Sequence, residues 1–418
     1  MRILVLGNVT WDDANSVGNT LSNWFGEWDG AQFSYMYNRD ALPNNSCCKR
    51  YYTASPLDIV KHIFTPWKIG KEFYINDIII GYKNKTEDNA LNNLTGYKRY
   101  LIKMIVDTLY ASNIWFNKKA KKFIKESNAD IVFLFAIPDA YRYNILKYFK
   151  RHTNAKIVEF IADDVYIQYC DNYGILNKVF KKRFPKMLRM ADKLYGASEL
   201  LCECYRREFG LKISPLYKGC SMSSPREEVN TPVKMIYAGN LRWGRAESLV
   251  NLVAELSKIN EKGVRAVLSI YSNSYVDETI RKKLNIGESA LYAEVSYERI
   301  KDLMSQSDIV LHVESFNEDQ IKLVHYSFST KIMDCLQSGS TMMIIGPKGI
   351  SSVEYARKIP GAIIIDRPDA LSEILEGVLK TPEDLIGRAS QINVFAKKNH
   401  LLSAVRATLQ LEFNELLK

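Results

Sequence analysis

Short apolar segments of strand length alternate with helical patterns along most of this chain. In the first half the apolar segments span residues 2–7, 131–137, 156–161 and 193–196. Strands that are near-continuous apolar runs and are separated by helices predict a parallel sheet with helices on both faces. The alternation therefore favours the α/β class over all-helical and all-β folds.

The alternation restarts after a polar segment with two prolines, residues 222–232 (MSSPREEVNTP), which we interpret as a linker. A chain of 418 residues is too long for one compact core. We therefore expect two doubly wound α/β domains in tandem, residues 1–221 and 233–395, with a helical segment at 396–418. Strand segments of the second domain are expected at 233–238, 266–271, 291–293, 309–313, 341–345 and 363–366.

The charge and residue usage limit the partners of the chain. A net charge of +10 favours an anionic partner such as a nucleotide, a phosphorylated lipid or a membrane surface. Nucleic acid is not expected, because the sequence has no RNP-like, zinc-finger or helix-turn-helix signature. Seven cysteines without a CxxC pair argue against a disulfide framework or a zinc site. This cysteine usage fits a reducing cytosol, so a cytoplasmic protein is expected. No segment approaches the roughly 20 apolar residues of a membrane-spanning helix, so we expect a chain that is soluble or at most lies on a membrane surface.

Residues 307–355 carry the clearest chemical signal, in the order strand, polar loop, helix, strand and turn. Ser329, Thr330 and Lys331 stand just before an apolar helical pattern at 332–336. A helix start has outward-pointing backbone N–H groups, and a lysine in its first turn adds positive charge. This point is therefore expected to bind an anion, most often a phosphate. The alternative is ordinary capping, with Lys331 paired to Asp334 three residues later.

Other strands of the second domain are also followed by polar loops. The carboxyl ends of parallel strands share one edge of the sheet, where ligands of doubly wound folds bind. Two arginines beside glycines after the strand 233–238 suit a diphosphate. His312 falls inside an apolar strand, so we expect a hydrogen-bonded core histidine. The further candidates at this edge are Gly239, Asn240, Arg242, Arg245 and Ser272.

The first domain has its own residues at strand ends. The loop after the first strand contains Gly7 and Asn8, and Gly18 comes before a helix expected to begin near residue 20. This loop has no GxGxxG, so a dinucleotide fingerprint is not supported. Asp163 and Asp164 end a later strand, where one of them could orient or deprotonate an acceptor hydroxyl. The alternative is a turn or capping pair.

Residues 96–128 form a helical pattern whose polar side is rich in lysine and arginine. A basic amphipathic stretch with aromatic residues can lie on an anionic membrane surface. The alternative, which we prefer, is a surface helix packed on the sheet.

The second domain resembles that of GT-B glycosyltransferases, nearest to the retaining family-4 type (glycosyl transferases group 1). In that family a strand is followed by G-R-L and then by a phosphate-binding lysine. This chain has YAGNL and then RWGR, which places Arg245 six residues after Gly239 and Asn240 where the family has arginine.

The later motifs of the family are Ser-x-Lys and a pair of spaced glutamates, of which the second binds the nucleotide ribose. The match to Ser-x-Lys is Ser329-Thr330-Lys331, and Asp334 takes the place of the second glutamate. Glu314 and Glu318 are both candidates for the first glutamate, and neither has the family spacing.

The resemblance implies two Rossmann-like domains that face each other across a cleft, with the final helix crossing back to the first domain. It implies a hexosyltransferase that moves a sugar, with retention, from a nucleotide-diphosphate sugar to an acceptor hydroxyl. The sequence contains no D-x-D metal motif. We therefore expect no metal or other cofactor, with Arg245 and Lys331 stabilising the charge of the leaving diphosphate.

By family analogy the acceptor is a lipid-linked saccharide in bacterial surface-polysaccharide synthesis, at the inner face of the membrane. The basic stretch at 96–128 would then provide a peripheral membrane contact. The alternative function is a non-catalytic sugar-nucleotide-binding or scaffold protein with the same fold, because the acid pair of the family is altered here.

Overall fold

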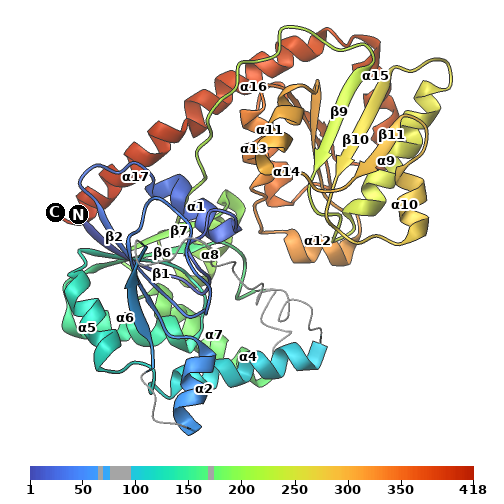
Figure 1. Cartoon of the computed structure of the whole chain (residues 1–418). Helices are drawn as coiled ribbons and strands as arrows, with labels where there is room; N and C mark the ends of the chain where they lie inside the picture. Colours follow the sequence, from blue (N-terminus) through green and yellow to red (C-terminus); the bar gives the residue numbers. More distant parts are fainter. Residues whose placement is uncertain (65–68, 76–95, 168–173) are drawn as a thin grey trace. The chain divides into compact units, whose positions relative to one another are not determined.

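The computed structural model describes residues 1–64, 69–75, 96–167 and 174–418. The chain forms two compact units, each built on a mainly parallel sheet (Figure 1). Unit 1 consists of Met1–Leu216 together with Arg406–Lys418, and unit 2 consists of Tyr217–Val405. The cleft expected between two domains stays a prediction, as do the predicted domain limits.

The polar segment 222–232, predicted as a linker, is bound to unit 2. The backbone N–H of Arg226 donates to Gly339, and its side chain lies 3.2 Å from the buried carboxylate of Asp308. The backbone N–H of Asn230 donates to the same carboxylate at 3.1 Å. Asp308 is only 2% exposed and needs such partners, which explains why this polar segment is held against the unit.

The sheet of unit 1 has eight strands within the described part of the chain, in the order β4-β3-β2-β1-β5-β6-β7-β8. Neighbouring strands are parallel except β3 and β4. The strands are β1 (Arg2–Leu6), β2 (Gln32–Tyr37), β3 (Arg50–Thr53), β4 (Lys71–Tyr74), β5 (Ile131–Phe135), β6 (Lys156–Ile161), β7 (Lys193–Gly196) and β8 (Ser214–Pro215). The helices are α1 (Ser16–Phe25), α2 (Pro56–Phe64), α4 (Gly96–Ala111), α5 (Lys118–Ser127), α6 (Ala140–His152), α7 (Gly174–Leu188), α8 (Glu199–Phe209) and α17 (Leu402–Leu416).

Alternate residues of the central strands of unit 1 face two separate cores. On one face, Leu4 and Leu134 pack with the apolar sides of α5 and α6, including Phe123 and Phe149. The other face is an aromatic cluster that α1 and α17 cover. There the rings of Phe25 and Phe133 lie 5.0 Å apart, and several further aromatic rings surround them.

The sheet of unit 2 is parallel throughout its described strands, in the order β11-β10-β9-β12-β13-β14. The strands are β9 (Val233–Ala238), β10 (Ala266–Tyr271), β11 (Ser289–Tyr292), β12 (Ile309–Val313), β13 (Thr341–Ile345) and β14 (Ile363–Ile365). The helices are α9 (Arg245–Asn260), α10 (Glu278–Leu284), α11 (Tyr297–Ser305), α12 (Glu318–Val324), α13 (Lys331–Gln337), α14 (Ser351–Ala356), α15 (Leu371–Lys380) and α16 (Asp384–His400). Helices α9 and α15 cover one face of the sheet, and α13, α14 and α16 cover the other.

Several predicted helices have different limits in the structure. The single helix expected at 96–128 is two helices, because Asn113 has a left-handed backbone (φ 59°) and Asn117 starts α5. Asn117 accepts hydrogen bonds from the N–H groups of Lys119 and Ala120, and its extended backbone, which is usual for a capping residue, interrupts the helical path. The helix expected near residue 20 begins at Ser16, because Asn15 caps it by accepting from Gly18. No helix among the described residues is long and apolar enough to cross a membrane.

Candidate functional site

The candidate site of unit 2 lies where the strand order of its sheet reverses. From β9 the chain proceeds to β10 and β11 on one side, whereas β12, β13 and β14 continue on the other side of β9. Loops from the carboxyl ends of β9 and β12 therefore diverge, and such a switch point is the usual ligand site of a doubly wound sheet. Gly239 directly follows β9, and Glu314 directly follows β12.

Gly239 and Lys331 are in direct contact at this edge. A Cβ atom at Gly239 would lie 1.8 Å from the Lys331 Nζ, so any side chain at 239 would occupy the position of the ammonium group. Lys331 is the first residue of α13, and its Nζ also lies 5.3 Å from the centre of the Tyr237 ring. The glycine after β9 is thus the residue that lets the lysine reach the switch point.

Lys331 is half-buried, and no carboxylate within the described residues lies at ion-pair distance from its Nζ. Burial and then the nearby Arg245 guanidinium lower the pKa of Lys331 to about 8. The Tyr237 ring compensates part of this cost through a cation–π contact. The side chain therefore presents an under-compensated positive charge at the position where a ligand is expected. The ion pair of Lys331 with Asp334, which was the alternative to anion binding, is not formed.

Arg245 was predicted to bind a phosphate, but its guanidinium is already bound by the protein. Its Nε and Nη2 donate to both carboxylate oxygens of Glu314 at 2.9–3.1 Å, and its Nη1 donates to Asn240 Oδ1 at 2.8 Å. Nε also donates to the carbonyl oxygen of Val313. Only 6% of Arg245 is exposed. Arg245 therefore ties the loop after β9 to the end of β12, which is a positioning role, and the direct phosphate contact stays a prediction.

Glu314 and His312 complete this buried cluster. His312 and Glu314 stand two residues apart at the end of β12, so their side chains are on the same face. His312 Nε2 lies 2.9 Å from Glu314 Oε1, and both residues are almost fully buried. Burial lowers the pKa of His312, so its ring is neutral near pH 7. Burial alone would raise the pKa of Glu314, but His312 and Arg245 hold that pKa below its ordinary value. Glu314, predicted to contact the substrate, is thus a carboxylate that holds Arg245.

The loop between β9 and α9 has an unusual backbone. Trp243 and Gly244 both have a left-handed conformation, with φ 56° and 70°. A Cβ atom at Gly244 would lie 2.2 Å from Ser315 Oγ, so the loop is packed closely against the residue after Glu314. Trp243 is 43% exposed, and its ring lies 5.1 Å from the Arg245 guanidinium. Arg242, also predicted to contact the substrate, is exposed at this loop.

The remaining predicted residues of unit 2 lie around the same edge with partners of their own. The Ser272 hydroxyl accepts from the N–H of Ser274, and the N–H of Ser329 donates to the hydroxyl of Ser352. Thr330 is the capping residue of α13, but its side chain makes no capping hydrogen bond. Asp334 Oδ1 accepts from the hydroxyl of Tyr297 at 3.1 Å, and burial raises the pKa of Asp334.

Two predicted glycines of unit 1 have packing roles. A Cβ atom at Gly7 would lie 1.7 Å from the hydroxyl of Tyr35, which donates to the carbonyl oxygen of Val9. Gly18 lies inside the first turn of α1. A Cβ atom at Gly18 would lie 2.2 Å from the carbonyl oxygen of Asp12, so the helix start packs closely against that backbone. The prediction of Gly18 as a loop residue is therefore wrong. Asn8 follows Gly7, and its carbonyl oxygen accepts from Arg39.

The two aspartates after β6 differ sharply. Asp164 is 5% exposed, and its Oδ1 accepts from the backbone of Tyr166 and Ile167 and from the hydroxyl of Tyr205 at 2.6 Å. These bonds are those of a turn residue, which was the stated alternative to catalysis. Asp163 is exposed at the same strand end, and it stays the predicted acceptor-side acid.

Comparison with solved structures identifies the fold of the chain. The E. coli trehalose-6-phosphate protein bound with UDP-2-fluoro glucose matches with a TM-score of 0.61 and 11% identity, over 100% of this chain and 99% of that one. The sucrose-phosphate synthase of Thermosynechococcus elongatus matches with a TM-score of 0.60 and 10% identity, over 100% and 99%. A trehalose-6-phosphate synthase analysed for glycosyl transfer with retention matches with a TM-score of 0.60 and 10% identity, over 99% of each chain. The chain has the GT-B fold. No family model and no curated protein matches the sequence.

Within this GT-B chain, the buried cluster of His312, Glu314 and Arg245 was not predicted as a unit. The spacing of His312 and Glu314 across the end of a strand is the signal that could have linked them. Their joint contact with Arg245 depends on the loop after β9, which the sequence does not place. Among the described residues, no group of three or more histidine, cysteine, aspartate or glutamate side chains is placed to hold a metal ion.

Proposed function

We propose that this protein is a retaining hexosyltransferase that moves a sugar from a nucleotide-diphosphate sugar to an acceptor hydroxyl without a metal ion. The proposal rests on unit 2, where the switch point of the sheet carries a lysine whose charge lacks a carboxylate partner among the described residues. The GT-B fold supports it, because neighbours of the same fold are named for reactions or complexes of this kind.

The observation that carries the proposal is the state of Lys331. A partly buried ammonium group costs free energy unless an anion compensates it, and burial and the nearby Arg245 accordingly lower the pKa of Lys331. A diphosphate placed beside Lys331 would supply the missing negative charge. During transfer the bond between the sugar and the diphosphate breaks, and negative charge grows on the leaving diphosphate. A lysine held at that position stabilises this charge more in the transition state than in the bound donor.

The second contribution comes from the start of α9. This helix has 16 residues, and its capping residue, Gly244, provides no side-chain acceptor, although the N–H groups of Arg245 and Ala246 donate to carbonyl oxygens of the preceding loop. The N-terminus of such a helix favours a bound phosphate. Arg245 and Glu314 contribute indirectly, because their ion pair holds the loop after β9 in place. Asn240, whose amide oxygen binds Arg245, belongs to the same support.

The acceptor is the less defined substrate. The solved structures that match this fold are named for trehalose-6-phosphate and sucrose-phosphate, which are phosphorylated sugars. These names favour a saccharide acceptor. A lipid-linked saccharide, a role in surface-polysaccharide synthesis, a cytoplasmic location and a peripheral membrane contact stay predictions from the sequence. Asp163, exposed after β6, is the candidate group that would receive the acceptor proton.

A non-catalytic sugar-nucleotide-binding protein is the second candidate. Two observations favour it: Glu314 is bound by Arg245 and His312, and Asp164 is bound by a turn and by Tyr205. Both carboxylates are therefore occupied in a structural role. Donor binding without release of free nucleoside diphosphate, and without transfer to any saccharide, would select this function.

The test begins with nucleoside diphosphates. Binding of UDP, GDP and ADP is measured by calorimetry on the full chain and on Lys331→Met, with Lys262→Met as the matched control because Lys262 is exposed. We expect the best nucleotide to bind at least ~10-fold more weakly to Lys331→Met, since a charge-assisted bond is lost, and to bind the control normally. Equal affinity in all three proteins would remove the diphosphate assignment.

The second stage uses the matching nucleotide sugar with a panel of sugars and sugar phosphates. Nucleotide release and the anomeric configuration of the product by NMR report transfer and its stereochemistry. We expect the rate to persist in EDTA, and a rate that requires added Mg²⁺ or Mn²⁺ would contradict the metal-independent mechanism.

A further inference from the structure

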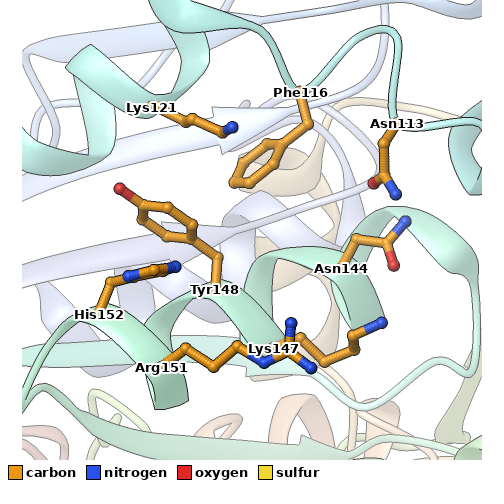
Figure 2. Close-up of a pocket in the computed structure, with 8 residues that line it drawn as sticks. All are labelled: Asn113, Phe116, Lys121, Asn144, Lys147, Tyr148, Arg151 and His152. Carbon is orange, nitrogen blue, oxygen red and sulfur yellow. The ribbon is translucent and has the colours of Figure 1, made fainter.

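The structure contains a second candidate binding site, in unit 1 and away from the strand ends already described. It is a cavity of about 310 Å³ lined by α5, α6 and the segment between α4 and α5 (Figure 2). We call it the α5–α6 pocket. Its size is at the lower end of the roughly 300–1,000 Å³ typical of small-molecule sites, so it suits a ligand of one ring rather than a long chain.

Three cations border the α5–α6 pocket, and none of its lining residues is acidic. Lys121 of α5 lies on one side of the pocket, and Lys147 and Arg151 of α6 lie on the other (Figure 2). Within the described residues, none of the three is at ion-pair distance from a carboxylate. Neighbouring Lys150, in contrast, is paired with Asp192 at 3.1 Å. The pocket therefore concentrates positive charge that cation–π contacts of Lys121 with Phe116 and of Lys147 with Tyr143 compensate in part, without a carboxylate partner in the described part of the chain.

Aromatic side chains form one wall of the pocket. The rings of Phe116 and Tyr148 meet edge to face with 5.3 Å between centroids, and His152 lies 4.6 Å from Tyr148. Because Phe116 and Tyr148 are nearly perpendicular to each other, at 81°, they leave no parallel slot for a flat nucleotide base. They offer instead an apolar surface on which the C–H face of a sugar ring can pack.

Two amide side chains add hydrogen-bonding groups. Asn144 comes from α6, and its Nδ2 donates to the carbonyl oxygen of Tyr110 at 3.2 Å, which fixes the orientation of the amide. Asn113 comes from the tight turn after α4, where its left-handed backbone holds it at the rim. Amides suit the hydroxyl groups of a polyol, which both donate and accept hydrogen bonds.

We propose that the α5–α6 pocket binds a phosphorylated polyol of single-ring size, with the phosphate between Lys121, Lys147 and Arg151 and the ring against Phe116 and Tyr148. The same chemistry occurs in a free sugar phosphate and in the headgroup of an inositol phospholipid. The site is independent of the donor site in unit 2, so its test does not depend on the proposed transferase activity.

The test compares two double variants of unit 1 that remove the same charge, one inside the pocket lining and one outside it. Binding of inositol 1-phosphate and of glucose 6-phosphate to the full chain is measured by calorimetry, with inositol and glucose as the uncharged references. The pocket variant is Lys147→Gln/Arg151→Gln. The control is Lys150→Gln/Arg189→Gln, which removes the same charge from unit 1 outside the pocket lining. Thermal melting checks that both variants are folded.

We expect at least ~10-fold weaker binding of the phosphorylated polyol to the pocket variant and no such loss in the control, because two charge-assisted contacts disappear. Equal affinity in the two variants, or equal binding of the uncharged polyol, would overturn the proposal. Tighter binding of a thymidine oligonucleotide than of either phosphorylated polyol would also overturn it.

A vesicle arm separates the two sources of the ligand. Flotation is measured with phosphatidylcholine vesicles, with and without phosphatidylinositol. Flotation that needs phosphatidylinositol and is lost in the pocket variant assigns the site to a lipid headgroup. Binding of the soluble phosphorylated polyols without flotation assigns it to a free sugar phosphate. Neither binding nor flotation that depends on the pocket would refute the site.

Discussion

The buried ion pair of Arg245 and Glu314 makes a sharp prediction about stability. Arg245 is 6% exposed and Glu314 is 2% exposed, so replacing Arg245 by methionine leaves a carboxylate inside unit 2 without its guanidinium. Breaking a buried pair by removing one partner typically costs about 3–5 kcal/mol, because the other charge stays desolvated. For a domain of this size that loss corresponds to a fall of roughly 6–20 °C in the melting temperature.

The measurement is the thermal or urea-induced unfolding of Arg245→Met and of the double variant Arg245→Met/Glu314→Leu. The exposed Arg242→Met in the same loop serves as the control. We expect the control to change the free energy of unfolding by less than about 0.5 kcal/mol. The double variant should recover much of the loss, because no unpaired charge remains.

The refuting result concerns the role given to Arg245. If Arg245→Met unfolds at the wild-type temperature but no longer binds a nucleoside diphosphate, the arginine contacts the ligand directly and is not a positioning residue. A normal melting temperature with normal nucleotide binding would show that the ion pair supports neither the fold nor the site.

Three further predictions concern protonation. The pKa of Lys331 is lowered to about 8, so the affinity for a nucleoside diphosphate should fall as the pH rises through about 8. This fall should disappear in Lys331→Arg, because arginine stays charged, and calorimetry between pH 7 and 10 would check it. Burial lowers the pKa of His400 to about 4, whereas the unfolded value is near 6.5. The unfolded chain therefore binds the proton first, and the folded state loses stability as the pH falls from 6.5 to 4. Melting curves should show a loss on the order of 3 kcal/mol between pH 6.5 and 4 that His400→Gln lacks. Burial raises the pKa of Glu159 to about 8, so its stability contribution is lost as the pH rises from 4.5 to 8 and Glu159→Gln should melt higher than wild type at pH 8 but not at pH 4.5.

The class of fold could be predicted from the sequence because each strand is an apolar run that stands out from its surroundings. The segments 156–161, 193–196 and 309–313 coincide with β6, β7 and β12. The limits of the helices were harder to predict, because a single capping side chain can set where a helix begins. Asn15 and Asn117 start α1 and α5 by accepting backbone hydrogen bonds, and Asn317 does the same for α12, inside a stretch predicted as a polar loop.

The candidate site could be located but not resolved from the sequence. Strand ends and glycines indicated the edge of the sheet that carries Gly239 and Lys331. The sequence did not predict which side chain pairs with each charged group, because the partners lie far apart in the chain. Arg245 pairs with Glu314, which lies 69 positions away, and Asp334 bonds with Tyr297 rather than with Lys331. The α5–α6 pocket was hidden for the same reason, because its cations come from two separate helices.

Helix α17 completes the core of unit 1, although it comes at the end of the chain. Phe413 is completely buried, and its ring lies within 6.4 Å of Phe25, Trp28 and Phe133, while Arg406 binds the carbonyl oxygens of Ser22 and Asn23. A ribosome makes these contacts available only after it has translated the whole of unit 2. Until then α1 covers this aromatic face without α17, and a nascent chain would expose part of it to chaperones and to other chains. Unit 2, whose residues are contiguous, can finish folding earlier than the unit that precedes it.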